Sequence, residues 1–411
     1  MMNQKKIYSA IVSVACVICA FIASMVACGG NEPTYTPPTT EPEPSDTIKP
    51  VVKKVYNWEK LRKSILKNTD MVLLYGGSHH RPVYQWDQNR TTPYVTYVDK
   101  NNEMHWLFDS FLLIEFKYTE PGQEQRDYSY ALGYSNYAGT KETWTKLLDY
   151  WFSEDTGIGA IDKTIEKAKE TLGEPPYKRQ IVLTLPEPIE HEQKNVPLST
   201  TKYWGEVRGK ELDFSKVEDQ YAALEWYIDE ARARFNEKKY KNIDFAGFYW
   251  VAEEASHAAG VMPLISEYMH SYNYSFNWIP YFTAAGRFQW KEHGFDVAYL
   301  QPNHYFTNDI PDTRLDETIK DINEHDMGLE IEFDESAVVG GSSTRYAAER
   351  LRTYMNKSIE LKAWSERRMA YYHGNDAIYK LYESDNDIDK KLYHEFCQFV
   401  VNRPIRINFK P

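Results

Sequence analysis

A (β/α)8 barrel of the α/β class is the fold that this 411-residue sequence predicts. Eight short apolar segments follow one another along the chain, and helical patterns of ten or more residues separate most of them. Strands linked in this way pair in parallel, and their number suits a closed barrel. A doubly wound open sheet, the alternative, would normally show a glycine-rich phosphate loop. Neither GxGxxG nor GxxxxGK[ST] occurs.

The predicted strands are runs rich in Val, Ile, Leu and aromatic residues, such as MVLLYGG, FLLIEF and QIVLTLPEP. The loop after the first strand, residues 76–106, is long and rich in His, Tyr and Trp, and loops of that length are often functional. We expect strands at 71–75, 111–116, 180–185, 245–251, 276–282, 296–300, 329–333 and 368–372, and helices at 140–152, 158–172, 214–235, 255–271, 312–324, 345–361 and 387–401.

The first 27 residues form a targeting segment rather than part of the fold. Two lysines precede an apolar run, which ends in a small residue followed by Cys28. This pattern resembles a bacterial lipoprotein signal, which implies that Cys28 is lipidated and becomes the mature N-terminus. The run is nearly long enough to span a bilayer, so a transmembrane anchor is the alternative. The lipoprotein interpretation predicts anchoring at the outer membrane, on the cell surface or in the periplasm.

Residues 28–52 are rich in Pro, Thr and acids and have little to bury, which predicts an extended tether. Residues 53–411 are then the single barrel domain. Without the signal, the chain has 46 basic and 60 acidic residues, which gives a net charge of −14. That charge argues against a nucleic-acid partner. Cys397 is the one cysteine of the domain, and its helical apolar surroundings predict a buried structural thiol.

Aromatic residues make up 15% of the chain, with 32 Tyr and 11 Trp. Most must fill the core, but rings in a cleft would stack on apolar faces of sugars. The active site of such a barrel lies at the carboxyl ends of its strands. A carbohydrate partner is therefore expected there.

The seventh strand is the most informative, because GLEIEFDES alternates apolar residues with acids. Period two puts Glu330, Glu332 and Asp334 on one face, which in a barrel points into the lumen. Three carboxylates make little sense as core, since burying an unpaired charge is costly. An edge strand with a solvated acidic face is the alternative.

The fourth strand, GFYWVAEEA, ends in Glu253 and Glu254. These acids could cap a helix over residues 255–271, because acids favour a helix N-terminus. They could also stand at the rim of the barrel mouth. We expect Glu253 to face the site and Glu254 to cap the helix.

Two carboxyl groups across a barrel mouth are what glycoside hydrolysis requires. GFYWVAEEA and GLEIEFDES resemble strands four and seven of the large barrel glycosidase superfamily, which implies that Glu253 is the acid/base and Glu332 the nucleophile of a retaining enzyme. An Asn usually precedes the acid/base in that superfamily, whereas Ala252 stands here. Glu254 and Asp334 are the reserves for the two roles.

The mature chain also resembles a family of Bacteroidetes-type lipoproteins, domain of unknown function 4855. The lipobox, YGG after the first strand, FYWxxEE and LQPN carry that resemblance. It implies a barrel and a setting in polysaccharide utilisation. The substrate-binding residues expected at the strand ends are His79, His80, Trp250, Tyr281, Gln301, Asn303, Tyr305, Tyr372 and His373.

No cofactor or metal is expected, because HExxH does not occur and adjacent histidines on an extended segment point in opposite directions. A serine hydrolase would carry a GxSxG elbow, which does not occur either. The main alternative to a glycoside hydrolase is a glycan-binding surface lipoprotein that keeps the barrel and its aromatic residues without catalysis.

Overall fold

The computed structural model describes residues 67–76, 86–120, 122, 126–194, 196–255, 257–341 and 346–408. The expected signal and tether, the boundary at residue 53, and the predicted residues Cys28, His79 and His80 lie outside these ranges. Within them, no helix is both long and apolar enough to cross a membrane.

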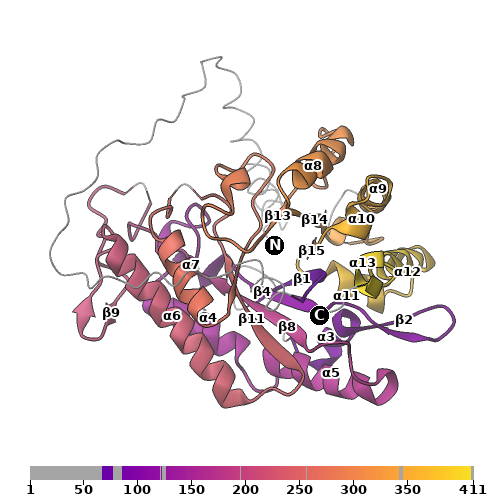
Figure 1. Cartoon of the computed structure of the whole chain (residues 1–411), viewed down its shortest axis with the longest axis horizontal. Helices are drawn as coiled ribbons and strands as arrows, with labels where there is room; N and C mark the ends of the chain where they lie inside the picture. The colour runs from indigo at the N-terminus through magenta and orange to yellow at the C-terminus, as the bar shows by residue number, and fades with distance from the viewer. Residues whose placement is uncertain are drawn as a thin grey trace, which may run out of the picture. The chain divides into compact units, whose positions relative to one another are not determined.

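Eight parallel strands close into a barrel, in which β15 pairs with β1 (Figure 1). All eight predicted strands are present, and the fifth is four residues shorter than expected at its carboxyl end. In order around the ring they are β1 (Asp70–Tyr75), β4 (Ser110–Ile114), β8 (Arg179–Leu185), β11 (Ile243–Trp250), β12 (Ser275–Trp278), β13 (Val297–Leu300), β14 (Gly328–Phe333) and β15 (Met369–His373).

Helices surround the ring of strands (Figure 1). Between β12 and β13 the connection, fully described, holds only the 3-10 turn η1 (Arg287–Gln289). Cys397 is buried in the last long helix, as predicted. The α-helices are α3 (Gln88–Val95), α4 (Lys141–Trp151), α5 (Ile158–Leu172), α6 (Val217–Lys238), α7 (Met262–Ser271), α8 (Thr313–Glu324), α9 (Ala348–Glu360), α10 (Ala363–Glu366), α11 (Ala377–Glu383), α12 (Asp387–Val401) and α13 (Pro404–Asn408).

Two predictions about the connections are wrong. The first loop, where described, contains α3 and a hairpin of β2 (Thr96–Val98) and β3 (Met104–Trp106). The helix expected from residue 255 begins only at Met262, because Gly260 and Pro263 favour a turn followed by a helix start. Small accessory sheets complete the chain: β5 (Lys117–Thr119), β6 (Asp127–Ser129) and β7 (Tyr137–Ala138), and β9 (Glu206–Val207) with β10 (Lys210–Glu211).

The two faces of β14 and β15 differ in character. Phe333 and Tyr371 point outward, where their rings lie 5.1 and 5.8 Å from that of Phe396 in α12. Because side chains alternate along a strand, Glu330 and Glu332 must point into the barrel. The alternation read from the sequence is therefore confirmed for this strand.

A bulge in β11 resets the alternation before the acidic end of that strand. Its pairing with β8 shifts between Phe245 and Gly247, and both Phe245 and Phe248 lie on the outer face with rings 5.0 Å apart. Gly247 has a φ of 149°, and a Cβ there would meet the Ser275 carbonyl oxygen at 2.1 Å. The bulge consequently leaves Tyr249 on the inner face.

A buried ion pair ties the C-terminal segment to the amino end of the barrel. Arg403 and Asp70 are fully buried and in direct contact, and Asp70 also accepts hydrogen bonds from Tyr371 (2.6 Å) and Thr69 (2.8 Å). Burial raises the pKa of Asp70, but Arg403, Arg406 and these hydrogen bonds outweigh it and hold that pKa below its usual value. The end opposite the mouth is thereby stabilised.

Candidate active site

Glu253 and Glu332 meet at the carboxyl end of the barrel. Glu332 is the fifth residue of β14, and Glu253 follows the end of β11 by three residues. Hydrogen bonds join Glu253 to Gln301 and Gln301 to Asn303, and the charge of Glu253 raises the pKa values of both Glu332 and Glu330, so the three carboxyl groups share one end of the barrel. The structure thus brings together the two residues predicted to be catalytic.

Glu332 is buried, with 2% of its surface exposed, and is surrounded by hydrogen-bond donors. The Tyr354 hydroxyl donates to its Oε2 over 2.6 Å, and the backbone N–H groups of Asn303 and His304 also donate to it. Burial raises the pKa of Glu332 to about 7, the donors oppose that rise and the charge of Glu253 adds to it. Its ionised form is consequently accessible near neutral pH.

Glu253 is half-buried and has a different donor at each oxygen. The Tyr134 hydroxyl donates to Oε2 over 2.6 Å, and Gln301 Nε2 donates to Oε1 over 2.7 Å. Burial raises the pKa of Glu253, the two donors oppose the rise, and the charge of Glu254 adds to it. This carboxyl group is therefore inclined to hold a proton.

A chain of amides connects the two acids. Gln301 bonds to Glu253, and its Oε1 accepts a hydrogen bond from Asn303 Nδ2 over 3.2 Å. Asn303 has a left-handed backbone with φ of 52°, which Asn tolerates better than most residues, and its N–H donates to Glu332. Gln301 and Asn303, both predicted site residues, therefore lie between Glu253 and Glu332.

The lumen below this pair holds a third acid. Glu330 is 3% exposed, and burial together with Glu332 and Glu253 raises its pKa well above its usual value. Tyr249 also lies on the inner face, and burial together with the charges of Glu253 and Glu330 raises the pKa of its hydroxyl. Because neighbouring carboxylates repel one another, the cluster disfavours ionisation of all three groups together.

An arc of aromatic rings runs along the same end of the barrel. Tyr134 stacks on Phe116 with ring centroids 4.3 Å apart, and Phe116 lies 6.2 Å from Tyr75. Tyr75 then contacts Tyr372 at 5.8 Å, and Tyr372 contacts Phe306 at 5.7 Å. Phe306 is 39% exposed. Tyr372, a predicted substrate-binding residue, is half-buried within this arc, which offers flat apolar surfaces beside Glu253.

Glu254 does not cap a helix, because α7 begins eight residues later at Met262. That prediction is wrong. Glu254 instead lies near Glu187, which is 3% exposed and accepts the Leu132 N–H over 2.7 Å. Burial raises the pKa of Glu187 to about 7, and the charge of Glu254 contributes. A second pair of acids therefore stands at the ends of β8 and β11.

Two predicted substrate-binding residues lie in the core. Trp250 is fully buried and packs edge-on against Phe276, with ring centroids 6.2 Å apart. Tyr249 before it points into the barrel, so Trp250 points outward. His373 is fully buried on the outer face and donates Nε2–H to the Leu73 carbonyl over 2.8 Å. Burial lowers its pKa to about 4. The structure gives neither side chain access to a substrate.

Two further predicted site residues, Tyr305 and Asp334, both contact Ser336. Tyr305 is fully buried, and its hydroxyl lies 2.9 Å from Ser336 Oγ. Asp334 accepts hydrogen bonds from the Ser336 N–H (2.8 Å) and hydroxyl (2.5 Å) and so caps the 3-10 turn η2 (Glu335–Ala337). Both residues stabilise the segment after β14, so Tyr305 has no access to a sugar and Asp334 does not serve as the reserve nucleophile.

Tyr281 is half-buried and forms an isolated parallel bridge with Gln301, which places its backbone beside the site. The sequence did not reveal Tyr134 or Tyr354, the phenols that contact the two acids. Tyr134 comes from a turn 119 positions before Glu253, and Tyr354 comes from an outer helix. A pattern local to one strand carries no signal for either contact.

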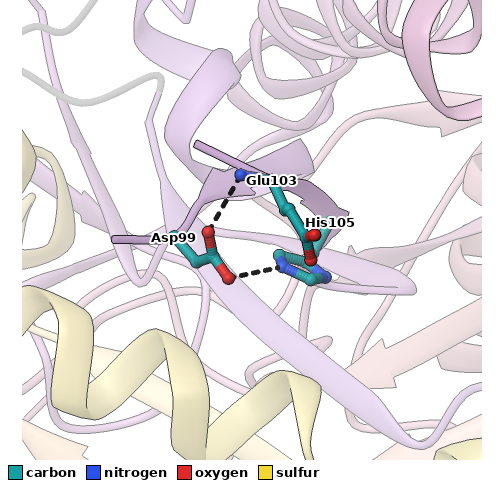
Figure 2. A group of neighbouring side chains, drawn as sticks. All are labelled: Asp99, Glu103 and His105. Atoms are coloured by element: carbon teal, nitrogen blue, oxygen red, sulfur yellow. Dashed lines mark hydrogen bonds and ion pairs between the residues drawn. The ribbon is translucent and has the colours of Figure 1, made fainter. Parts of the chain in front are cut away.

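One group of side chains in the described part of the chain has ligand atoms suited to a metal ion (Figure 2). Asp99, Glu103 and His105 lie on the β2–β3 hairpin, with those atoms within 4.8 Å of one another. Asp99 also accepts the N–H groups of Asn101 and Glu103, and its other oxygen lies 3.3 Å from His105 Nε2. These bonds of the hairpin turn account for the grouping, which lies near the amino end of β4, away from the acids.

Comparisons with solved structures give weak likenesses. A "putative alpha-L-fucosidase" from Bacteroides thetaiotaomicron is 12% identical with a TM-score of 0.43, over 88% of this chain and 99% of the other. A mannanase from Thermotoga petrophila is 14% identical with a TM-score of 0.36, over 75% and 88%. A mutant tryptophan synthase alpha-subunit from Pyrococcus furiosus is 12% identical with a TM-score of 0.34, over 81% and 98%. Likenesses this weak carry no information on the reaction.

No curated protein matches the sequence. One family model does, over residues 70–398, which include every strand of the barrel and all the acids described above. The chain belongs to the family described as domain of unknown function DUF4855.

Proposed function

We propose that the chain is a glycoside hydrolase whose paired carboxyl groups are Glu253 and Glu332. The observation that carries the proposal is that both acids stand at the carboxyl ends of barrel strands, β11 and β14, and that the hydrogen-bonded amides of Gln301 and Asn303 lead from Glu253 toward Glu332. Glycoside hydrolysis needs two such groups, one holding a proton and one ionised. Each acid also has neutral hydrogen-bond donors that fix its position.

We assign different roles to the two acids. Glu332 accepts hydrogen bonds from a tyrosine hydroxyl and two backbone N–H groups, which stabilise a carboxylate, so we assign it the role of nucleophile. Burial and a neighbouring acid raise the pKa values of both Glu253 and Glu332, so the pKa shifts alone do not assign the roles, and we assign Glu253 the role of general acid from its position after the fourth strand of the barrel. It is also the more exposed of the pair.

The proposed reaction proceeds in two steps with retention. A carboxylate oxygen of Glu332 attacks the anomeric carbon, the glycosidic C–O bond breaks, and the proton of Glu253 moves to the leaving oxygen. Ionised Glu253 then takes a proton from a water molecule, whose oxygen attacks the anomeric carbon and displaces Glu332. Both acids return to their starting states.

The substrate we propose is a complex polysaccharide or a glycoconjugate. Within the aromatic arc, Tyr134 and Tyr372 are half-buried and Phe306 is exposed, and these three rings offer faces on which the apolar faces of sugars can stack. Polar groups of the neighbouring amide chain could bond to sugar hydroxyls.

A screen of the purified protein against a polysaccharide panel tests this function, with Glu253→Gln and Glu332→Gln as variants. We expect the wild type to release sugars and each variant to lose at least about a hundredfold in rate while still binding the glycan. If the wild type binds a glycan but cleaves none, and substitution of Phe306 weakens the binding, the protein is a glycan-binding lipoprotein instead.

We also propose that Cys28 carries the lipid that anchors the protein at the outer membrane, as part of a polysaccharide-utilisation system. The motif that precedes Cys28 supports this. Full-length protein and Cys28→Ala can be compared by labelling with a radioactive fatty acid and by detergent partition. We expect label only with Cys28, and a variant with equal labelling would contradict the anchor.

A further inference from the structure

The hydrogen bonds around Glu253 define which of its oxygens can hold a proton. Asn303 Oδ1 accepts the Phe282 N–H over 2.8 Å, and a backbone N–H can only donate. Gln301 Nε2 donates to the Ile279 carbonyl over 2.9 Å, and a carbonyl can only accept. These two backbone groups fix the orientation of both amides in the chain, because turning either amide over would oppose two donors or two acceptors.

With both amides fixed, Gln301 presents an N–H group to Oε1 of Glu253. A proton on Oε1 in this direction would face that N–H, so along this direction Oε1 accepts in both protonation states of Glu253. At Oε2 the partner is the Tyr134 hydroxyl, at 2.6 Å. A hydroxyl can donate or accept by rotating about its C–O bond.

We propose that neutral Glu253 carries its proton on Oε2, and that Tyr134 is the positioning residue which accepts from this acid and donates to its carboxylate. The assignment rests on the proposed function, in which Glu253 gives that proton to the leaving oxygen. For the transfer, the O–H bond at Oε2 turns from Tyr134 toward the leaving oxygen, and the Tyr134 hydroxyl then rotates to donate to the new charge. No proton is transferred to or from Tyr134.

Two properties suit Tyr134 to this role. Its ring stacks on Phe116 at 4.3 Å and an interplanar angle of 18°, which fixes the ring while the hydroxyl stays free to rotate. Burial and the charge of Glu253 raise the pKa of Tyr134 well above its usual value, so it remains a neutral phenol.

The other titratable groups facing Glu253 act in the opposite direction. Glu254 disfavours its charge. The charge of Glu253 in turn raises the pKa values of Glu330 and Glu332 in β14 and of Tyr249 in β11, and none of these groups stabilises the carboxylate of Glu253. In the described part of the chain, Tyr134 and Gln301 are the side chains that stabilise the carboxylate of Glu253. Because Gln301 donates in both protonation states, Tyr134 is the partner that responds to the proton.

Two substitutions at position 134 test the inference with opposite signs. Tyr134→Phe keeps the stacked ring and removes the donor, so the pKa of Glu253 should rise. Site-specific 3-fluorotyrosine keeps a hydroxyl that is a stronger donor, so that pKa should fall. Tyr128→Phe, which removes a phenol from the neighbouring strand β6, is the control. The pKa of Glu253 is read in each by carbon-13 NMR of labelled glutamate, with Glu253→Gln giving the assignment.

We expect Tyr134→Phe to raise the pKa of Glu253 by about one unit, fluorotyrosine to lower it, and the control to leave it unchanged. The basic limb of the pH profile of kcat/KM should move in the same directions. The inference would be overturned if the pKa of Glu253 were the same in the wild type, in Tyr134→Phe and in the fluorotyrosine protein. It would also be overturned if the two changes at position 134 shifted that pKa in the same direction. The NMR titration does not depend on turnover, so a wild type that hydrolyses no glycan refutes the proposed function separately.

Discussion

The hydroxyl of Tyr354 lies 2.6 Å from Oε2 of Glu332, so a residue of the outer helix α9 contacts an acid on the inner face of the barrel. The same hydroxyl accepts the His304 N–H over 3.3 Å, so it lies beside the segment that follows β13. The ring of His304 packs against Tyr354 at 5.3 Å and holds it there.

Tyr354→Phe should move the acid limb of the pH profile of kcat/KM to higher pH by about one unit. Glu332 must be ionised to act as nucleophile, and this hydrogen bond lowers a pKa that burial raises to about 7. The variant should also lose activity near neutral pH and recover it in alkali. Tyr382→Phe, at a surface position of α11, serves as control. An unchanged acid limb would show that Tyr354 does not tune Glu332.

Glu187→Gln should change how the free energy of unfolding depends on pH. Burial and Glu254 raise the folded pKa of Glu187 from 4.5 to about 7, so its stabilising contribution is complete below pH 4.5 and is lost as pH rises through 7. The charge should cost on the order of 3 kcal/mol at pH 8. Urea unfolding should show the variant to be more stable than the wild type at pH 8 and equal to it at pH 4.5. Parallel curves for the two proteins would contradict this.

Arg403→Met should lower the free energy of unfolding by about 3–5 kcal/mol, because it leaves the carboxylate of Asp70 buried without its partner. Arg208→Ala is the matched control, since that arginine is 79% exposed and pairs with Glu225 on the surface. The control should change stability by less than about 1 kcal/mol. Similar losses in the two variants would argue against the buried pair as the source of stability.

Gly247→Ala should destabilise the barrel by more than about 2 kcal/mol, because a Cβ would lie 2.1 Å from the Ser275 carbonyl oxygen. Gly173→Ala is a control for backbone strain alone. It also has a positive φ, 69°, but its Cβ would meet nothing within 4 Å. Its cost should be about 1 kcal/mol. Thermal unfolding measures the difference, and equal losses would mean that the close strand contact at Gly247 is unimportant.

The strands could be predicted because each is a short apolar run, and the acids of β14 could be predicted because its side chains alternate without interruption. Trp250 and His373 were misplaced because being near a strand end does not fix the direction of a side chain. In β11 the bulge at Gly247 changes which side chains point into the barrel, and no pattern in the sequence predicts that shift. The helix start at Met262 was missed because alanines extended the apparent helix toward Glu254.

Local sequence patterns do not predict contacts between distant parts of the chain. Tyr134 and Tyr354 reach the two acids from a turn and an outer helix, and only the folded chain brings them there. The position of Gln301 and Asn303 at the carboxyl end of the barrel could be predicted because they follow a strand. Their role as a link between Glu253 and Glu332 depends on the left-handed backbone at Asn303.

Trapping the covalent intermediate tests the central claim most directly. The purified protein would be incubated with 2-deoxy-2-fluoro glycosides of the sugars it hydrolyses, digested and analysed by mass spectrometry. We predict one fluoroglycosyl group on the peptide of β14, attached to Glu332, and none in Glu332→Gln. A group attached to another residue, or full hydrolysis of glycans by Glu332→Gln, would contradict the assignment of Glu332 as the nucleophile.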